Sequence, residues 1–305
     1  MSDCKASEVV RHYSTLSDAL LDKDLMKIAN QLFVHHEFPL MSSYLKEIKQ
    51  DFNAEPEELD LKNGREACQG SNSENLEEAF VEEKTDGMIK HLIDPVDHEW
   101  ERLILINAVF FKAEWKQPFD SRNTAPDTFY GVKGDRQERF MKERIDCSYK
   151  FQPDVQMLSL HYKENGYYLV IMMPTGDYEE WRANLNGKMF LSLLTRCRSG
   201  HVQVSIPKFK IEAELDGMRT LKTLRVNRMF TPQGYFTDMA ECPELYVSMI
   251  QHKAIVDMDE EGTRAAAATA VDMMCGCSLK KFTGDHPFIY AIMYEKNILF
   301  LGQFV

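Results

Sequence analysis

The 305-residue sequence lacks the signatures of the common enzyme classes. It has no GxSxG, HExxH, P-loop or GxGxxG motif. The histidines are scattered, and the neighbours His35 and His36 would point to opposite faces of a strand, which disfavours joint chelation. The adjacent carboxylates Glu82-Glu83 and Glu260-Glu261 are more typical of solvated faces than of acid–base pairs. We therefore expect a protein that is not an enzyme and needs no cofactor.

The chain also has few cysteines and no long apolar run. The number of cysteines is odd and their spacing sparse, which is not the pattern of a disulfide scaffold: Cys4, Cys68, Cys147, Cys197, Cys242, Cys275 and Cys277. The first twenty residues contain no apolar core of signal-peptide length, no run of eighteen apolar residues occurs, and no Asn-x-Ser/Thr acceptor is found. These absences predict a cytoplasmic protein with no membrane span.

The balance of charge is acidic, with a formal net charge of −12 and a pI of about 5.3. Such a chain repels phosphate backbones on average, so we expect no nucleic-acid partner. Hydrophobic residues make up 44% of the sequence, which supplies ample material for a packed core. The length suits one large domain or two medium ones, and composition alone leaves both open.

Strand and helix signals are mixed along the chain without strict alternation, which predicts the α+β class. We expect strands near 28–34, 103–115, 167–174, 201–215 and 246–259, and a hairpin over 288–305 that turns at 295–297. Helical patterns are expected over 7–50 on either side of the first strand, over 76–93 with a stop at Gly87, and at 178–195, and a polar surface loop is expected at 54–75. The strand over 103–115 is continuously apolar, which predicts cover on both faces.

The stretch from Asp257 to Phe288 is the most informative. Taken alone, the alanine run at 265–268 would predict a turn of helix, because alanine is the best helix former. Gly262 precedes the run, however, and small and polar residues follow it before the next strand. These neighbours favour an exposed loop.

The sequence EEGTRAAAATA at 260–270 resembles the hinge of the reactive-centre loop in inhibitory serpins. Further segments resemble serpin text in the same order along the chain: MKIANQLF (26–33), FVEEKTDGMIKHLID (80–94), INAVFFKAEWKQPFD (106–120), VSIPKFKIE (204–212), QHKAIVDMDEEG (251–262), DHPFIYAI (285–292) and ILFLGQFV (298–305). The resemblance, nearest to intracellular ovalbumin-type serpins, implies one serpin-like domain over 1–305. That fold has large mixed and antiparallel sheets, A, B and C, with helices around them and an exposed reactive-centre loop at about 260–282.

The family's mechanism, implied by this resemblance, is suicide inhibition of a protease. The protease cleaves the loop and is trapped as an acyl-enzyme, while the loop inserts into sheet A as a new strand. The hinge residues so assigned are Glu260, Glu261, Gly262, Thr263, Arg264, Ala265, Ala266, Ala267, Ala268 and Thr269. In an inserted strand every second residue, from Thr263 to Thr269, shares a face that is small enough to enter the core. Arg264 falls on the opposite face, where its charge stays hydrated.

Three further residues match family positions around the opening of sheet A. Trp115 matches the breach, at the top of the opening, whereas Asn107 and His252 match the shutter, where polar contacts hold the two central strands together. Without the resemblance, His252 would be read as an ordinary core histidine.

Family spacing places the reactive bond at Gly276–Cys277, with Cys275–Gly276 as the alternative. Neither bond offers the basic side chain of a trypsin substrate or the acidic one of a caspase substrate. The expected partner is therefore an elastase-, chymotrypsin- or cathepsin-like protease. Cys275 and Cys277 lack the second pair that a zinc site needs, so we predict no bound metal.

The resemblance begins at the family's helix D, near residue 7, so helices A to C have no counterpart in the sequence. Two hypotheses follow: a monomeric protease inhibitor, or a non-inhibitory serpin-like binding protein that lost trapping with those helices. The same observation leaves an extracellular location open.

Overall fold

The computed structural model describes residues 8, 10–11, 13–15, 25–52, 56–59, 76–89, 102–195, 197–242, 244–260 and 280–305. The chain forms two compact units. The first comprises Met1–Lys112 and Lys210–Asp257, and the second Ala113–Phe209 and Met258–Val305. The prediction of one serpin-like domain over 1–305 stays a prediction.

The named elements follow in chain order: β1 (Met26–His35), α2 (Ser42–Phe52), β2 (Glu57–Leu59), α4 (Leu76–Lys84), β3 (Leu103–Phe111), η2 (Ser121–Asn123), β4 (Ala125–Gly131), β5 (Gly134–Phe151), β6 (Val155–His161), β7 (Tyr167–Pro174), α5 (Tyr178–Asn184), α6 (Gly187–Leu193), β8 (Arg198–Pro207), β9 (Phe209–Asp216), α7 (Gly217–Thr223), η3 (Arg228–Phe230), β10 (Met249–Met258), β11 (Lys280–Thr283), β12 (Phe288–Tyr294) and β13 (Asn297–Phe304). Sheets and helices without strict alternation confirm the predicted α+β class.

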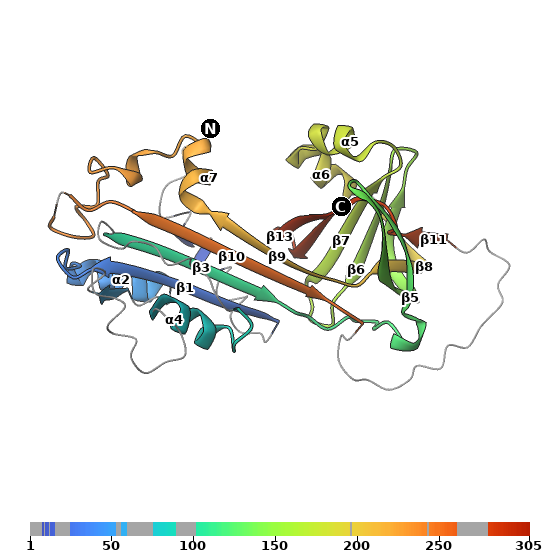
Figure 1. Ribbon diagram of the computed structural model, residues 1–305, viewed down its shortest axis with the longest axis horizontal. Helices are drawn as coiled ribbons and strands as arrows, with labels where there is room; N and C mark the ends of the chain where they lie inside the picture. Colours follow the sequence, from blue (N-terminus) through green and yellow to red (C-terminus); the bar gives the residue numbers. More distant parts are fainter. Residues whose placement is uncertain are drawn as a thin grey trace. The chain divides into compact units, whose positions relative to one another are not determined.

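The first unit is built on a five-stranded sheet in the order β2-β1-β3-β10-β9 (Figure 1). β1 runs antiparallel to β3, whereas β3 and β10 run parallel to each other. The parallel pair is formed by strands far apart in sequence, from Ile104 paired with Met249 to Phe111 paired with Val256. The centre of the sheet is therefore a parallel ladder flanked by an antiparallel one.

Side chains alternate across this sheet. Ile104, Ile106, Ala108 and Phe110 of β3 join one buried cluster, which also contains Val81 of α4. The intervening β3 residues are half-buried from position 105 to 109. On the other face Leu103 belongs to a second buried cluster and Leu105 packs against it, whereas Asn107 and Val109 are half-buried. Cover on the second face, expected for the whole strand, is therefore partial beyond Leu105.

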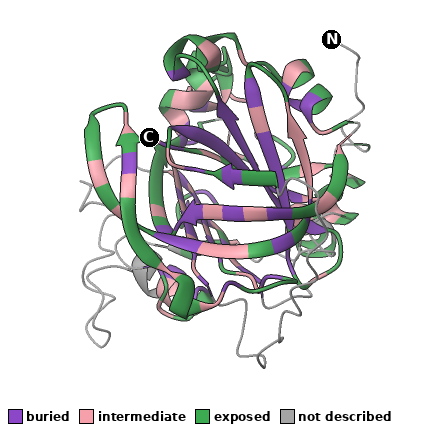
Figure 2. Ribbon diagram, turned by 90° about the vertical axis from the view of Figure 1, so that its right-hand side faces the viewer, coloured by how far each residue is buried: buried purple, intermediate pink, exposed green. Residues whose placement is uncertain are grey.

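The second unit contains an eight-stranded sheet in the order β11-β8-β5-β6-β7-β12-β13, with β4 paired to β5. Its core residues are apolar and deeply buried along β6, β7 and β12. Buried and exposed stretches alternate along several strands in Figure 2, as expected for sheets with one face on a core. The predicted strand at 167–174 and hairpin at 288–305 are confirmed as β7 and as β12–β13, with Glu295 in the left-handed region (φ 52°) at the turn.

Two segments predicted as continuous elements are each divided. The helical pattern over 178–195 forms two short helices, α5 and α6, because Asn186 accepts a hydrogen bond from the Met189 N–H and starts a new helix. The strand pattern over 201–215 forms β8 and β9, and Lys208 lies between them. That break places Lys208 in a connection rather than within a ladder.

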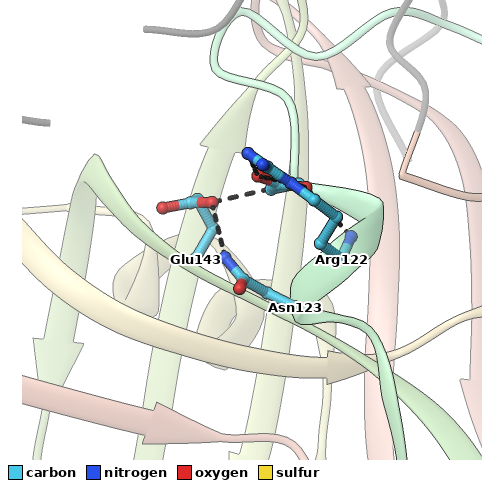
Figure 3. A network of polar contacts seen from close by, with 4 residues as sticks. Arg122, Asn123 and Glu143 are labelled. Atoms are coloured by element: carbon cyan, nitrogen blue, oxygen red, sulfur yellow. Dashed lines mark hydrogen bonds and ion pairs between the residues drawn. The ribbon is translucent and has the colours of Figure 1, made fainter. Parts of the chain in front are cut away.

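A polar network fixes the connection that leads into β4 (Figure 3). Asp120 caps the η2 turn by accepting from the Arg122 N–H, and its carboxylate also binds the Arg122 guanidinium. These hydrogen bonds lower the pKa of Asp120 to about 2. Glu143 of β5 accepts from the Asp120 N–H at 3.4 Å and from the Asn123 amide at 3.5 Å. The turn is thereby tied to β5.

Candidate functional site: the root of the predicted loop and the strands before it

Of the predicted hinge, only Glu260 belongs to the described residues. The remaining hinge residues, Glu261 to Thr269, and the reactive-bond residues Cys275, Gly276 and Cys277 lie outside them. The described chain resumes at Lys280, so residues 280–282 at the end of the predicted loop lie in β11. The part of the site that can be built is the root of the loop, residues 258–260, and the strand β10 that leads to it.

Glu260 is buried, with 7% of its surface exposed, and forms an ion pair. Its Oε2 accepts a hydrogen bond from Lys208 Nζ at 2.7 Å. Burial is the largest single influence and opposes ionisation of the carboxyl, but the hydrogen bonds from Lys208, the backbone and Thr124 together with the charge of Lys208 outweigh it, and the pKa of Glu260 lies below its ordinary value. The expectation that Glu260 lies on a solvated face was wrong, because Lys208 compensates the charge of the buried carboxylate.

Trp115 holds the next residue of the root. The indole is buried, with 4% exposed, and its Nε1–H donates to the carbonyl oxygen of Asp259 at 2.8 Å. The ring stacks on Tyr162 with centroids 4.6 Å apart, and Phe119 meets it edge-on. Trp115 lies beyond the end of β3, where it forms an isolated antiparallel bridge with Tyr162. The indole thus packs against two aromatic rings, and its N–H binds the backbone of the root.

Tyr162 extends this support to Met258, the last residue of β10. Its hydroxyl lies 3.8 Å from the Met258 sulfur. Complete burial raises the pKa of Tyr162 well above its ordinary value, so the phenol stays neutral. Residues 258, 259 and 260 are therefore each held by a contact to a different side chain of the second unit.

A ladder of polar side chains crosses the first unit's sheet, from Asn30 of β1 through Asn107 of β3 to His252 of β10. The three residues are direct partners in the strand register. The Asn107 amide nitrogen donates to Asn30 Oδ1, so its oxygen faces His252 Nδ1. His252 must then donate through Nδ1, which selects the neutral tautomer that carries the proton there.

Burial lowers the pKa of His252 below its ordinary value, so the imidazole is neutral near pH 7. One ion pair also joins the carboxyl ends of β3 and β10, between Lys112 Nζ and Asp257 at 3.5 Å. The parallel pair is thus fastened at its middle by the ladder and at its end by the ion pair. The main-chain ladder between β3 and β10 joins the two strands along the same length, from Ile104 paired with Met249 to Phe111 paired with Val256.

This arrangement can accept another strand. β10 continues directly into the root of the loop, so a chain that reversed after Glu260 would run antiparallel to β10. Because β3 runs parallel to β10, the same segment would be antiparallel to both neighbours if it lay between them. Such a strand would form a main-chain hydrogen-bond ladder with β3 and another with β10, in place of the single main-chain ladder that joins these two strands.

The described residues give no sign of a metal centre or a membrane span. Within them, no group of three or more His, Cys, Asp or Glu side chains could hold a metal ion. A search of the same residues finds no helix that is long and apolar enough to cross a membrane.

The fold and this site match a known class of protein. A family model described as Serpin (serine protease inhibitor) matches residues 2–305. The chain therefore belongs to the serpin family, and the resemblance seen in the sequence is confirmed.

Among similar proteins, Serpin B6 of Macaca fascicularis is 33% identical over 293 residues, which are 92% of this chain and 76% of that protein. Neuroserpin of Mus musculus is 30% identical over 96% of this chain and 74% of its own length. Each relative therefore has a part to which this chain does not align.

Solved structures give the same fold. Native protease nexin-1, crystallised with heparin, has a TM-score of 0.83 at 25% identity and matches over 97% of this chain and 81% of its own. Uncleaved ovalbumin has a TM-score of 0.86 at 17% identity over 99% and 87%. At that identity the likeness shows the fold alone.

Two residues of the site were not singled out in the sequence. Lys208 lies inside the serpin-like segment 204–212, and Asn30 lies inside 26–33. Their position within those serpin-like segments is the sequence signal that could have indicated them. A local pattern could not, because their partners Glu260 and Asn107 are more than fifty residues away.

Proposed function

We propose that the chain inhibits a serine or cysteine endopeptidase by cleavage of its reactive loop and insertion of that loop between β3 and β10. One observation carries the proposal. The two central strands of the five-stranded sheet run parallel, and one of them leads straight into the root of the predicted loop. Family membership supports a protease as the partner in general.

The energetics favour insertion once the loop is cut. A new strand between β3 and β10 replaces one ladder with two, so the backbone groups of the loop exchange water for ladder partners. The loop residues would also enter a layer that already buries Ala108, Phe110 and Ile255. Before the cut, the loop is tethered at both ends and the fastenings between β3 and β10 oppose opening.

The hinge residues from Thr263 to Thr269 suit this movement. In an inserted strand every second side chain from Thr263 to Thr269 would face the core. These side chains are threonine and alanine, which add little volume to that core. Arg264 has the opposite parity, so its guanidinium stays in water. Met274 and the small residues after it favour an elastase-, chymotrypsin- or cathepsin-like protease, with Gly276–Cys277 or Cys275–Gly276 as the bond that is cut.

The test is formation of a covalent complex that survives SDS. We expect such a complex with at least one elastase-, chymotrypsin- or cathepsin-like protease. Mass spectrometry of the released fragment should place the cut within residues 274–278. Thr263→Arg should convert the inhibitor into a substrate, because a charge would have to enter the core face. Arg264→Glu, on the opposite face, is the matched control and should trap at the parental ratio.

Cleavage of the loop without any covalent complex in the parental protein would refute the inhibitory function and favour the non-inhibitory binding protein. Trapping by Thr263→Arg at the parental ratio would refute the assigned parity. A first cut upstream of Thr269 would refute the loop assignment itself.

A further inference from the structure

The segment of residues 217–237, which contains α7 and η3, carries cations and no carboxylate. It follows β9 in the first unit (Figure 1). On a chain whose net charge is −12, it has four basic residues, all of them exposed: Arg219, Lys222, Arg225 and Arg228. Within the part of the chain that the structure describes, no ion pair joins any of the four to a carboxylate. The segment is therefore a local concentration of uncompensated positive charge.

Stabilisation of α7 accounts for only part of this charge. Cations favour the C-terminal end of a helix, which suits Lys222 and Arg225. Arg219 stands in the first turn instead, where the helix dipole repels a cation. Arg219 and Lys222 are also one turn apart, a spacing at which like charges are unfavourable. A role in holding the helix therefore does not explain Arg219.

Arg225 occupies a position at which glycine is the usual residue. α7 ends in a Schellman motif, in which the Arg225 N–H donates to the Lys222 carbonyl oxygen and the Val226 N–H donates to the Leu221 carbonyl oxygen. This motif needs a left-handed residue after the helix, and Arg225 has φ 66°. A side chain is strained there, whereas glycine is not. Because the fold favours glycine at this position, the guanidinium indicates a role outside the fold.

Large apolar side chains stand exposed among these cations. Leu224 is 68% exposed, Val226 is 42% exposed and Tyr235 is 76% exposed. The segment is nevertheless anchored, because Met218 and Leu221 on the other side of α7 pack against a buried cluster of the first unit. The exposed apolar side chains are thus presented to solvent by an element that is fixed from below.

The end of α7 lies beside η3, so the two elements form one surface. Lys222 Nζ is 5.3 Å from the centre of the Phe230 ring in η3. The guanidinium of Arg228, the first residue of η3, lies over the Tyr235 ring at 3.9 Å from its centre. Its Nε–H also donates to the Gln233 carbonyl oxygen at 3.2 Å. The exposed tyrosine is thereby held against a cation.

We propose that residues 217–237 dock peripherally on a membrane surface that carries anionic phospholipid headgroups. Lysine and arginine side chains attract such headgroups, and exposed leucine and tyrosine side chains gain by burial at the boundary between headgroups and acyl chains. Both kinds of side chain interleave in this segment. The docking belongs to the first unit and does not depend on the proposed inhibition of a protease.

The acidic remainder of the chain restricts this docking to close contact. At an ionic strength of about 0.1 M the Debye length is about 10 Å, so carboxylates farther than this from the membrane are largely screened. A long polyanion such as heparin is the weaker candidate, because it would meet the cations but leave Leu224 and Tyr235 in water. Heparin binding is accordingly one of the outcomes of the test.

The test measures co-sedimentation of the full chain with phosphatidylcholine vesicles, either pure or with about 30% phosphatidylserine, at about 100 mM salt. The charge variant is Arg219→Gln/Lys222→Gln/Arg225→Gly. Its matched control removes three exposed lysines elsewhere and so has the same net charge: Lys46→Gln/Lys133→Gln/Lys188→Gln. Melting curves of all variants check that each is folded.

We expect the parent to bind the phosphatidylserine vesicles and not the pure phosphatidylcholine vesicles, and to be released at about 500 mM salt. The charge variant should bind at least about tenfold more weakly, because each cation near an anionic surface contributes severalfold to the affinity. The control should change less than about twofold, since its lysines lie outside the segment.

Two further variants separate binding from folding. Arg225→Gly alone should melt at the parental temperature or above it, because glycine relieves the strain, and should still bind about fivefold more weakly. Leu224→Gln/Tyr235→Gln should bind vesicles about threefold or more weakly with an unchanged affinity for heparin, because only the membrane buries these side chains.

Several results would overturn the docking. They are equal binding to both kinds of vesicle or to neither, an equal loss in the control, and heparin binding without vesicle binding. Vesicle affinity that Leu224→Gln/Tyr235→Gln leaves unchanged would overturn it as well, because charge alone would then account for the binding.

Discussion

At the scale of single residues, the ion pair between Lys208 and Glu260 fixes the point where the sheet ends and the loop begins. Lys208→Met leaves a buried carboxylate without its cation, so we expect the free energy of unfolding to fall by about 1–3 kcal/mol. The loss stays below that of a fully buried pair because 41% of the Lys208 side chain is exposed. Urea denaturation near pH 7 measures it.

The sign of the pH dependence follows from the lowered pKa of Glu260. A carboxyl whose pKa is lower in the folded state stabilises the fold above its unfolded pKa, about 4.5, and this contribution disappears as the pH falls through the folded value. The difference between parent and Lys208→Met should therefore shrink below about pH 4.5. The control Lys208→Met/Glu260→Gln should lose less than the single variant, and a larger loss would contradict the pairing.

Burial also decides the reactivity of Cys147. Its thiol is buried in β5, and burial raises the pKa to about 12, so almost no thiolate exists at pH 7.5. We expect iodoacetamide to leave Cys147 unmodified in the folded protein and to modify it on unfolding. Cys242, which is half-buried, serves as the internal comparison in the same peptide map. Alkylation of Cys147 in the folded protein at the rate of Cys242 would contradict this assignment.

At the scale of elements, the ladder Asn30–Asn107–His252 should oppose separation of β3 from β10. We expect Asn107→Ala to accelerate annealing of a synthetic peptide with the sequence of residues 263–274 by about threefold to tenfold, because about 1 kcal/mol of hydrogen bonding no longer opposes opening. Native gel shift or fluorescence of a labelled peptide gives the rate. An unchanged rate would show that the ladder does not limit opening.

Protonation of His252 gives a second test of whether the ladder Asn30–Asn107–His252 opposes separation of β3 from β10. Because its folded pKa is lowered, the neutral form stabilises the sheet above its unfolded pKa of about 6.5, and this contribution is lost as the pH falls through the folded value. Annealing in the parent should therefore accelerate in mildly acidic buffer. The variant His252→Gln should lack that acceleration.

The elements themselves were predictable to different degrees. The strand Tyr167–Pro174 and the hairpin around Glu295 follow from local pattern, because an apolar run and a turn suffice to define them. The long strand Gly134–Phe151 was not predicted, since its first half is largely polar and half-exposed. Its ladder partners β4 and β8 hold it in place, and that information is not local.

The site divides in the same way. Resemblance assigned Asn107 and His252 to the shutter and Trp115 to the breach at the top of the opening, and these roles stay predictions. In the structure Asn107 bonds to His252, and the Trp115 indole donates to the Asp259 carbonyl. The resemblance did not predict that Glu260 is buried, because burial there depends on Lys208, which is 52 residues away. Long-range pairing of this kind leaves no periodic trace in a sequence.

At the scale of the whole molecule, cleavage of the loop between Val271 and Ser278 should raise the melting temperature. An inserted strand that adds about ten ladder bonds at about 1 kcal/mol each would shift the midpoint by about 15 °C in a chain of this size. Differential scanning calorimetry before and after limited proteolysis measures the shift. A cleaved protein that melts at the original temperature has not inserted its loop.

The fluorescence of Trp115 can report movement of the loop root, residues 258–260. The sequence has three tryptophans, Trp100, Trp115 and Trp181, and the structure describes the last two. Trp115 is packed on Tyr162 and bonded to the Asp259 carbonyl, so its emission responds to any displacement of the loop root. Replacement of Trp100 and Trp181 by phenylalanine leaves Trp115 as the single tryptophan, which can be excited selectively at the red edge of the absorption band. Stopped-flow fluorescence can then follow the root in real time, without a label on the loop.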